Sequence, residues 1–319
     1  MDKELSGKIK SLIQKKKSFA EVCEMLELKD YELIGLVSLM KQDGELIDYV
    51  NGEIIHYKKP IENNNVYEIP NNLETLKILL ISDTHLVNKA DRLDILRYLY
   101  DKAEKLKIKH ILHSGDILDG MYTNRPQQIF ELRKHGFDEH LEYCVDKYPR
   151  FDGKTYFVGG NHLETYIRNG GSDMGKAIAK ERDDLIYLNP DTADLKIGNL
   201  KVRMHHGGGG RAYSLSYKLQ RYAETVNVND RPHIITQGHF HNAFYMNYQD
   251  MHCFQVGALM DETQFSRSLG FKNEKSCWWV NVQMDKNGNP LTIEPTLESF
   301  EGNKKLVKRK WFPIFWCFS

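Results

Sequence analysis

A chain of 319 residues suits one large domain or two smaller ones, and 41% hydrophobic residues with 11% aromatic residues exclude a disordered protein. Its 44 basic and 44 acidic side chains cancel, so binding to nucleic acid would have to come from local patches. The five cysteines form no CxxC pair, which favours reduced thiols over a disulfide framework. The sequence has no signal peptide and no run of about 18 apolar residues, so it predicts a soluble, cytoplasmic protein.

Residues 1–59 predict a small N-terminal domain. Apolar residues at helical spacing predict three helices, one around residues 9–13, one over residues 19–26 and one over residues 31–40. The runs ELIDYV and EIIHYKK, separated by Asn51-Gly52, predict a hairpin. Three helices followed by such a wing resemble a winged helix-turn-helix, which binds DNA in some proteins and protein in others. The third helix has one lysine and no arginine, so its charge does not indicate base reading.

The segment 60–72 is polar and turn-rich and predicts a linker. Over residues 73–300, short apolar runs then alternate with helical patterns such as ADRLDILRYLYDKAEKLK and GGSDMGKAIAKER. The expected strands are KILLIS, HILHSG, TYFVGG, VRMHHG and HIITQG. This alternation predicts an α/β domain, in which ligands bind at the carboxyl ends of the strands. Two later runs, MHCFQVG and KSCWWVNVQMD, predict a second sheet.

The last segment, residues 301–319, joins the basic run KKLVKRK to the aromatic run WFPIFWCFS. A basic and aromatic tail of this kind can dock on a partner protein, on another subunit or at a membrane surface. Packing against its own domain is the alternative.

Each of the five expected strands ends in side chains that can bind a metal ion. They are Asp83 and His85, Asp116 and Asp119, Asn161 and His162, His205 and His206, and His239 and His241. This set offers oxygen and imidazole ligands without a thiolate. It therefore suits manganese, iron or zinc better than copper(I) or a structural zinc ion.

In chain order the five blocks read DxH, GDxxD, GNH, H and GHxH, and over about residues 76–260 they resemble the calcineurin-like metallophosphoesterases. The resemblance implies an α/β fold, a four-layer αββα sandwich of two mixed sheets with helices outside. It also implies a hydrolase with two divalent metal ions, Mn²⁺ first, with Fe or Zn as alternatives. The implied ligands are Asp83, His85 and His241 for one ion, Asn161, His239 and either His205 or His206 for the other, and Asp116 for both.

The run HHGGGG leaves the choice between its two histidines open. A histidine directly before glycine favours His206, whereas the HPGGG pattern of related phosphoesterases favours His205, which we prefer here. The resemblance further implies that His162, when protonated, gives a proton to the leaving oxygen or stabilises the developing charge, and that Asp119 orients a ligand or a turn. Arg211, after the glycines, is a candidate phosphate contact. Many relatives have an acid directly after GNH, where this chain has Leu163 and then Glu164, so the partner of His162 stays open.

The function expected from this resemblance is attack of a metal-bridging hydroxide on a phosphate ester. Because of the N-terminal domain, we expect a phosphodiesterase or nuclease that acts on nucleic acid or nucleotides. One alternative is a phosphatase for small molecules or phosphoproteins. A second alternative is an inactive binding or regulatory protein on the same fold.

Overall fold

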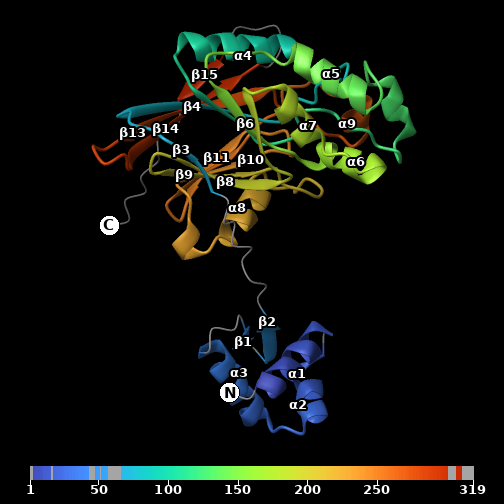
Figure 1. Ribbon diagram of the computed structural model, residues 1–319, viewed down its shortest axis with the longest axis vertical. Helices are drawn as coiled ribbons and strands as arrows, with labels where there is room; N and C mark the ends of the chain where they lie inside the picture. Colours follow the sequence, from blue (N-terminus) through green and yellow to red (C-terminus); the bar gives the residue numbers. More distant parts are fainter. Residues whose placement is uncertain are drawn as a thin grey trace. The chain divides into compact units, whose positions relative to one another are not determined.

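The computed structural model describes residues 3–15, 17–42, 47–50, 52–56, 66–300 and 307–310. The chain divides into two compact units, Met1–Asn64 and Asn65–Ser319 (Figure 1). None of the helices in the described ranges is both long and apolar enough to cross a bilayer.

The described residues of the smaller unit form the helices α1 (Lys3–Gln14), α2 (Phe19–Leu26) and α3 (Asp30–Gln42). An antiparallel hairpin follows, made of β1 (Ile47–Val50) and β2 (Glu53–His56). Helix α2 begins with a capping box, because Ser18 Oγ accepts from the Glu21 amide while the Glu21 carboxylate accepts from the Ser18 amide. Buried apolar side chains from all three helices and β1 form its core. These elements lie where the apolar spacing predicts them.

The larger unit is built on two mixed sheets. The first runs in the order β15 (Val307–Lys310), β14 (Pro290–Ser299), β13 (Ser276–Met284), β4 (Thr75–Ile81), β5 (His110–His113), β6 (Lys154–Val158) and β7 (Leu185–Asn189). The second runs in the order β11 (Phe244–Tyr248), β12 (Met251–Gln255), β10 (Ile234–Gln237), β9 (Leu200–His205), β8 (Thr192–Ile197) and β3 (Tyr67–Ile69). Strands β4 to β7 are parallel, and β10 is parallel to both of its neighbours.

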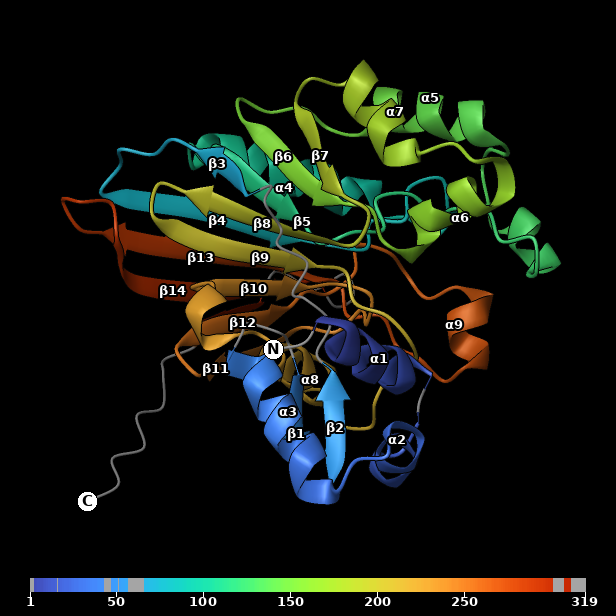
Figure 2. The same cartoon turned by 60° about the horizontal axis from the view of Figure 1, so that its bottom comes forward.

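The apolar side chains of these strands separate into layers because successive residues of a strand face opposite sides. Along β4, Ile78 and Leu80 belong to the core between the sheets, whereas Leu79 and Ile81 pack with α4 (Leu93–Lys105), α5 (Phe137–Lys147) and α7 (Met174–Glu181). Helix α8 (Tyr217–Glu224) packs on the other sheet. Figures 1 and 2 show α4, α5 and α7 on the side of the first sheet and α8 on the side of the second. This arrangement agrees with the expected sandwich.

Four further helical segments complete the described chain. They are η1 (Pro126–Phe130), α6 (Asn161–Gly170), η2 (Val228–Asp230) and α9 (Gln264–Ser268). Helix α6 begins at a predicted ligand, Asn161, and α9 lies beside the pocket described below.

Two expectations from the sequence are wrong in part. The predicted linker includes β3, which pairs in parallel with β8, so residues 67–69 belong to the sandwich, whereas residues 60–65 lie outside the described ranges. The runs MHCFQVG and KSCWWVNVQMD do not share a sheet, because β12 pairs with β10 and β13 pairs with β4. Of the predicted tail, β15 is described and pairs with β14, while residues 301–306 and 311–319 lie outside the described ranges.

Candidate functional site

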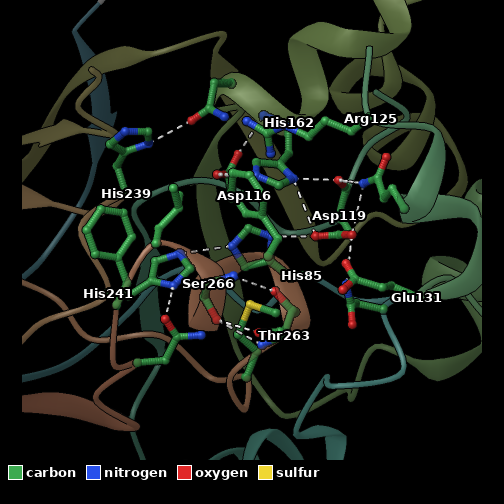
Figure 3. A pocket seen from close by; sticks show the side chains of 18 of the residues that line it. His85, Asp116, Asp119, Arg125, Glu131, His162, His239, His241, Thr263 and Ser266 are labelled. Carbon is green, nitrogen blue, oxygen red and sulfur yellow. Dashed lines mark hydrogen bonds and ion pairs between the residues drawn. The ribbon is translucent and has the colours of Figure 1, made fainter. Parts of the chain in front are cut away.

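The ends of β4, β5, β6, β9 and β10 bring the predicted ligands into two adjoining clusters (Figure 3). In the first, His241 Nε2 lies 3.2 Å from both Asp83 Oδ1 and His85 Nε2. In the second, His206 Nε2 lies 2.9 Å from Asp116 Oδ2. Asn161 Oδ1 is 3.1 Å from His206 Nε2 and 2.7 Å from His239 Nδ1. Asp116 also lies in a group with His85 and His162 whose ligand atoms are within 4.8 Å of one another, so it stands between the clusters.

Each of the four clustered histidines has its other ring nitrogen bound to an oxygen that carries no hydrogen. His85 Nδ1 donates to the Asp119 carboxylate at 3.1 Å, and His206 Nδ1 donates to the Ser114 carbonyl at 2.8 Å. His239 Nε2 donates to the Gly209 carbonyl at 2.8 Å, and His241 Nδ1 donates to Asn273 Oδ1 at 2.9 Å. Because such an acceptor holds a hydrogen on the bound nitrogen, the other nitrogen of each ring is the one that can present a lone pair to the cluster when the ring is neutral. This is the arrangement that a metal ion needs.

At five of the predicted site residues the backbone adopts a left-handed conformation that residues other than glycine rarely take. Asp83, His85, Asp116, His239 and His241 all have φ between 43° and 70°. Such residues cost free energy and persist where the surrounding structure holds them, which is common at functional sites. Gly115, directly before Asp116, packs closely against the second cluster. A Cβ added at this position would lie 2.3 Å from His206 Nδ1.

Burial and neighbouring charges strongly shift the pKa values of side chains at the site. Burial opposes the imidazolium of His85, but Asp119 and Asp83 outweigh it and raise the pKa of His85 to about 10. In the same way, burial is outweighed by Asp116, which raises the pKa of His206 to about 9. Burial also opposes ionisation of Asp116, yet His206 and His162 hold the pKa of Asp116 below its usual range. Without metal these imidazoles carry protons at neutral pH, so metal binding must release protons and should strengthen as pH rises.

The structure separates the two histidines of HHGGGG. His206 is fully buried and belongs to the second cluster. The His205 ring instead stacks on Tyr222 at 3.9 Å, and its Nδ1 lies 3.1 Å from the Asp191 carboxylate. The preference for His205 is therefore not supported, because successive residues at the end of β9 face opposite sides. Leu200, Val202 and Met204 are buried along this strand, and His206 continues their side.

His162 lies beside both clusters, and its hydrogen-bond partner is Asp119 rather than Glu164. Its Nδ1 donates to the Asp119 carbonyl, and its Nε2 lies 3.8 Å from Asp116 Oδ2. Burial is the main reason that the pKa of His162 lies below its usual range. Glu164 does not contact it, since its carboxylate accepts from Arg168 on the exposed surface of α6. Asp119 is therefore the partner of both His85 and His162.

A pocket of about 700 Å³ opens onto the clusters. Arg211, the predicted phosphate contact, is among its lining residues, packs on the ring of Phe271 at 4.6 Å and donates to the Lys272 carbonyl at 3.0 Å. The pocket is also lined by residues of η1 and α9, which no motif predicts.

Comparison with known proteins agrees with this geometry. The model of the calcineurin-like phosphoesterase superfamily domain matches residues 76–271, more than half of the chain. The chain belongs to this superfamily. None of the curated proteins matches the chain in sequence.

Solved structures with a similar fold to this calcineurin-like phosphoesterase differ widely in sequence. An archaeal phosphodiesterase shares 13% identity with a TM-score of 0.41, covering 70% of this chain and 99% of that chain. Vps29 of Entamoeba histolytica, solved with zinc, shares 15% identity with a TM-score of 0.43, covering 74% and 99%. Vps29 of Cryptosporidium parvum shares 14% identity with a TM-score of 0.45, covering 75% and 99%.

The family and the clusters together indicate a divalent metal site in this calcineurin-like phosphoesterase, and its residues fit such ions. Carboxylate, amide and imidazole ligands suit divalent cations, and the second nitrogen of each clustered histidine is already anchored. Three polar residues that support the site were missed by sequence reasoning. Asn88 and Gln128 donate to the Asp119 carboxylate at 2.9 and 3.0 Å, and Asn273 holds His241. They stand outside the motif blocks, so the sequence carries no signal for them.

Exchange of each histidine in HHGGGG tests their separate positions in the phosphoesterase domain. We expect His206→Ala to lose bound metal and to lower kcat/KM by roughly a hundredfold or more. This loss exceeds the one expected when a residue that only hydrogen-bonds to a metal ligand is replaced. His205→Ala should keep the metal content and change kcat/KM by less than about threefold. Metal analysis and steady-state kinetics on the two variants measure this. The opposite ranking would contradict the assignment.

Proposed function

We propose that the protein is a dinuclear metal-dependent phosphodiesterase that acts on nucleic acid or nucleotides. The observation that carries this proposal is the pair of histidine and aspartate clusters, with Asp116 of the second cluster also grouped with His85 of the first. Every predicted ligand position has a ligating side chain, which supports an enzyme over an inactive binding protein of the same fold.

Different side chains would bind the metal ions, donate a proton and bind the phosphate. Asp83, His85 and His241 would hold one ion, Asn161, His206 and His239 the other, and Asp116 both. When bound, two divalent ions supply an acidified water nucleophile and charge that offsets the phosphate. When the His162 ring is protonated, its Nε2 is the position from which a proton can reach the leaving oxygen, while the Asp119 carbonyl holds its Nδ1. Arg211 binds a non-bridging phosphate oxygen from the wall of the pocket.

Two features support a nucleotide or nucleic-acid diester over a small monoester. The pocket volume of about 700 Å³ lies in the range of sites that enclose a ligand of nucleotide size. Two arginines, Arg125 and Arg211, line it in addition to the predicted metal ligands, which suits a substrate with more than one anionic group. We propose Mn²⁺ as the ion, with Fe or Zn as alternatives, since the ligand set offers oxygen and nitrogen but no sulfur.

Hydrolysis of bis(p-nitrophenyl) phosphate and of p-nitrophenyl phosphate, with added Mn²⁺ and with a chelator, tests the proposal. We expect chelator-sensitive turnover with a higher kcat/KM for the diester. Preference for the monoester would favour a phosphatase for small molecules or phosphoproteins. Absence of turnover with metal bound would overturn the enzymatic proposal in favour of a binding protein.

We also propose that the N-terminal unit is winged-helix-like and recruits a polymeric substrate. Its order of helices followed by a hairpin supports this, as does its being a compact unit of its own. The four described cysteines are free and buried, which suits the reducing cytoplasm that we propose as its location.

Deletion of residues 1–59 leaves β3 and both sheets intact and tests this recruitment. We expect an unchanged kcat/KM for the small diester and a loss of roughly tenfold or more for single-stranded or duplex DNA or RNA, through KM. Kinetics on both kinds of substrate measure it. An equal loss on both would make residues 1–59 a structural part of the catalytic unit.

A further inference from the structure

A guanidinium group stands between two aromatic rings at the side of the pocket. Arg125 Cζ lies 4.2 Å from the ring centre of Tyr122 and 4.1 Å from that of Phe265. Arg125 directly precedes η1, whereas Phe265 belongs to α9, so two distant segments of the chain form the stack. Arg125 and Phe265 line the same pocket as the metal-binding clusters, and Figure 3 shows the Arg125 side chain directed into it on the side of His162.

Both ring centres lie within about 4.2 Å of Arg125 Cζ, and among the described residues the N–H groups of this guanidinium make no hydrogen bond to a protein acceptor. Within the described parts of the chain, no carboxylate comes within ion-pair distance of Arg125. Glu131 lies near enough to interact with the Arg125 charge but forms no ion pair with it, and the Asp119 carboxylate accepts from His85, Asn88 and Gln128. A planar fork of donors without a protein acid suits a phosphate group, which can accept two parallel hydrogen bonds.

One of the two rings beside this guanidinium, Tyr122, is held by residues that also contact the clusters. Tyr122 Oη accepts from Asn161 Nδ2 at 2.7 Å, while Asn161 Oδ1 faces His206 and His239. The buried Gln128 accepts from the Tyr122 amide at 2.8 Å and donates to the Asp119 carboxylate at 3.0 Å. The arginine is therefore ordered before a ligand arrives, which reduces the entropy cost of binding.

We infer that Arg125 binds a second phosphate of the substrate, beside the one cleaved between the metal ions. This inference rests on the proposed phosphodiesterase function and narrows it to substrates that carry at least two phosphate groups. The second phosphate can come from the next nucleotide of a strand or from a nucleoside polyphosphate. In either case Arg125 is a positioning residue that sets specificity.

Binding of thymidine 3′,5′-bisphosphate and thymidine 5′-monophosphate to the full chain with Mn²⁺, measured by calorimetry, tests the inference. We expect the bisphosphate to bind roughly tenfold or more tightly than the monophosphate, as charged hydrogen bonds contribute. Arg125→Gln should bring this ratio close to one. Arg125→Lys should give an intermediate ratio, because it keeps the charge but loses the planar fork. Thymidine 5′-diphosphate distinguishes the sources, since tighter binding of it than of the 3′,5′-bisphosphate identifies a polyphosphate.

Arg267→Ala is the matched control, because this arginine belongs to α9 but does not line the pocket, and it should keep the wild-type ratio. If Arg125→Gln fails to fold, Phe265→Ala removes one wall of the stack and should lower the ratio in part. A wild-type ratio near one, or a ratio that Arg125→Gln leaves unchanged, would overturn the inference. Turnover of bis(p-nitrophenyl) phosphate by the same wild-type sample reports on the phosphodiesterase separately, so the two proposals can fail independently.

Discussion

Replacement of Asp116 by asparagine is expected to abolish hydrolysis and to weaken metal binding in both clusters. Asp116 is the acid between the clusters, and its carboxylate is the charge that would offset repulsion between two adjacent divalent ions. Asparagine has nearly the same shape and can still accept from the His162 amide, which lies 2.9 Å from Asp116 Oδ1. The substitution therefore removes charge while leaving the local backbone in place.

We expect kcat/KM for the chromogenic diester to fall by about three orders of magnitude or more, which corresponds to about 4 kcal/mol of transition-state stabilisation. Metal content per chain should fall in parallel. Asp152→Asn is the matched control, because its side chain is 83% exposed on the surface and should leave both quantities unchanged. Full activity of Asp116→Asn with two metal ions bound would remove Asp116 from the bridging position.

Replacement of His162 by asparagine is expected to slow turnover while metal binding persists. His162 Nδ1 is held by the Asp119 carbonyl, and its Nε2 lies 3.8 Å from Asp116 Oδ2, beside the clusters. The four histidines of the two clusters do not depend on it for their hydrogen bonds. A proton donor of this kind contributes about 10²- to 10⁴-fold to the rate.

The choice of leaving group separates proton donation from other roles of His162. An alcohol needs a proton as it leaves, whereas p-nitrophenolate leaves without one. We therefore expect the loss in His162→Asn to be large for a dinucleotide and small for the chromogenic diester. His135→Asn, at an exposed position, is the control. Equal losses on both substrates, or metal content that falls with activity, would contradict a role in proton transfer.

Much of the fold was predictable because each of the five strands next to the site is an apolar run that ends in a block of potential metal ligands. Their apolar runs alternate with helical patterns along the chain, and glycine precedes or follows the ligating residues in most of the blocks. The pairing of strands was less accessible. Strand β3 is only three residues long and lies in a polar segment, so local composition predicted a linker. Strands β12 and β13 show similar patterns but pair in different sheets, because pairing depends on partners far along the chain.

The sequence by itself determined which kinds of side chain gather at the strand ends, and therefore the phosphoesterase family and the set of candidate ligands. Residue types and spacing suffice for that, because the carboxyl ends of neighbouring parallel strands lie at one edge of a sheet. Only the tertiary structure decided that His206 faces Asp116 while His205 stacks on Tyr222. It also brought Phe265 of α9 against Arg125 beside η1. Arg125 and Phe265 are 140 residues apart in the chain, and Asp116 and His206 are 90 apart, so no local pattern encodes these contacts.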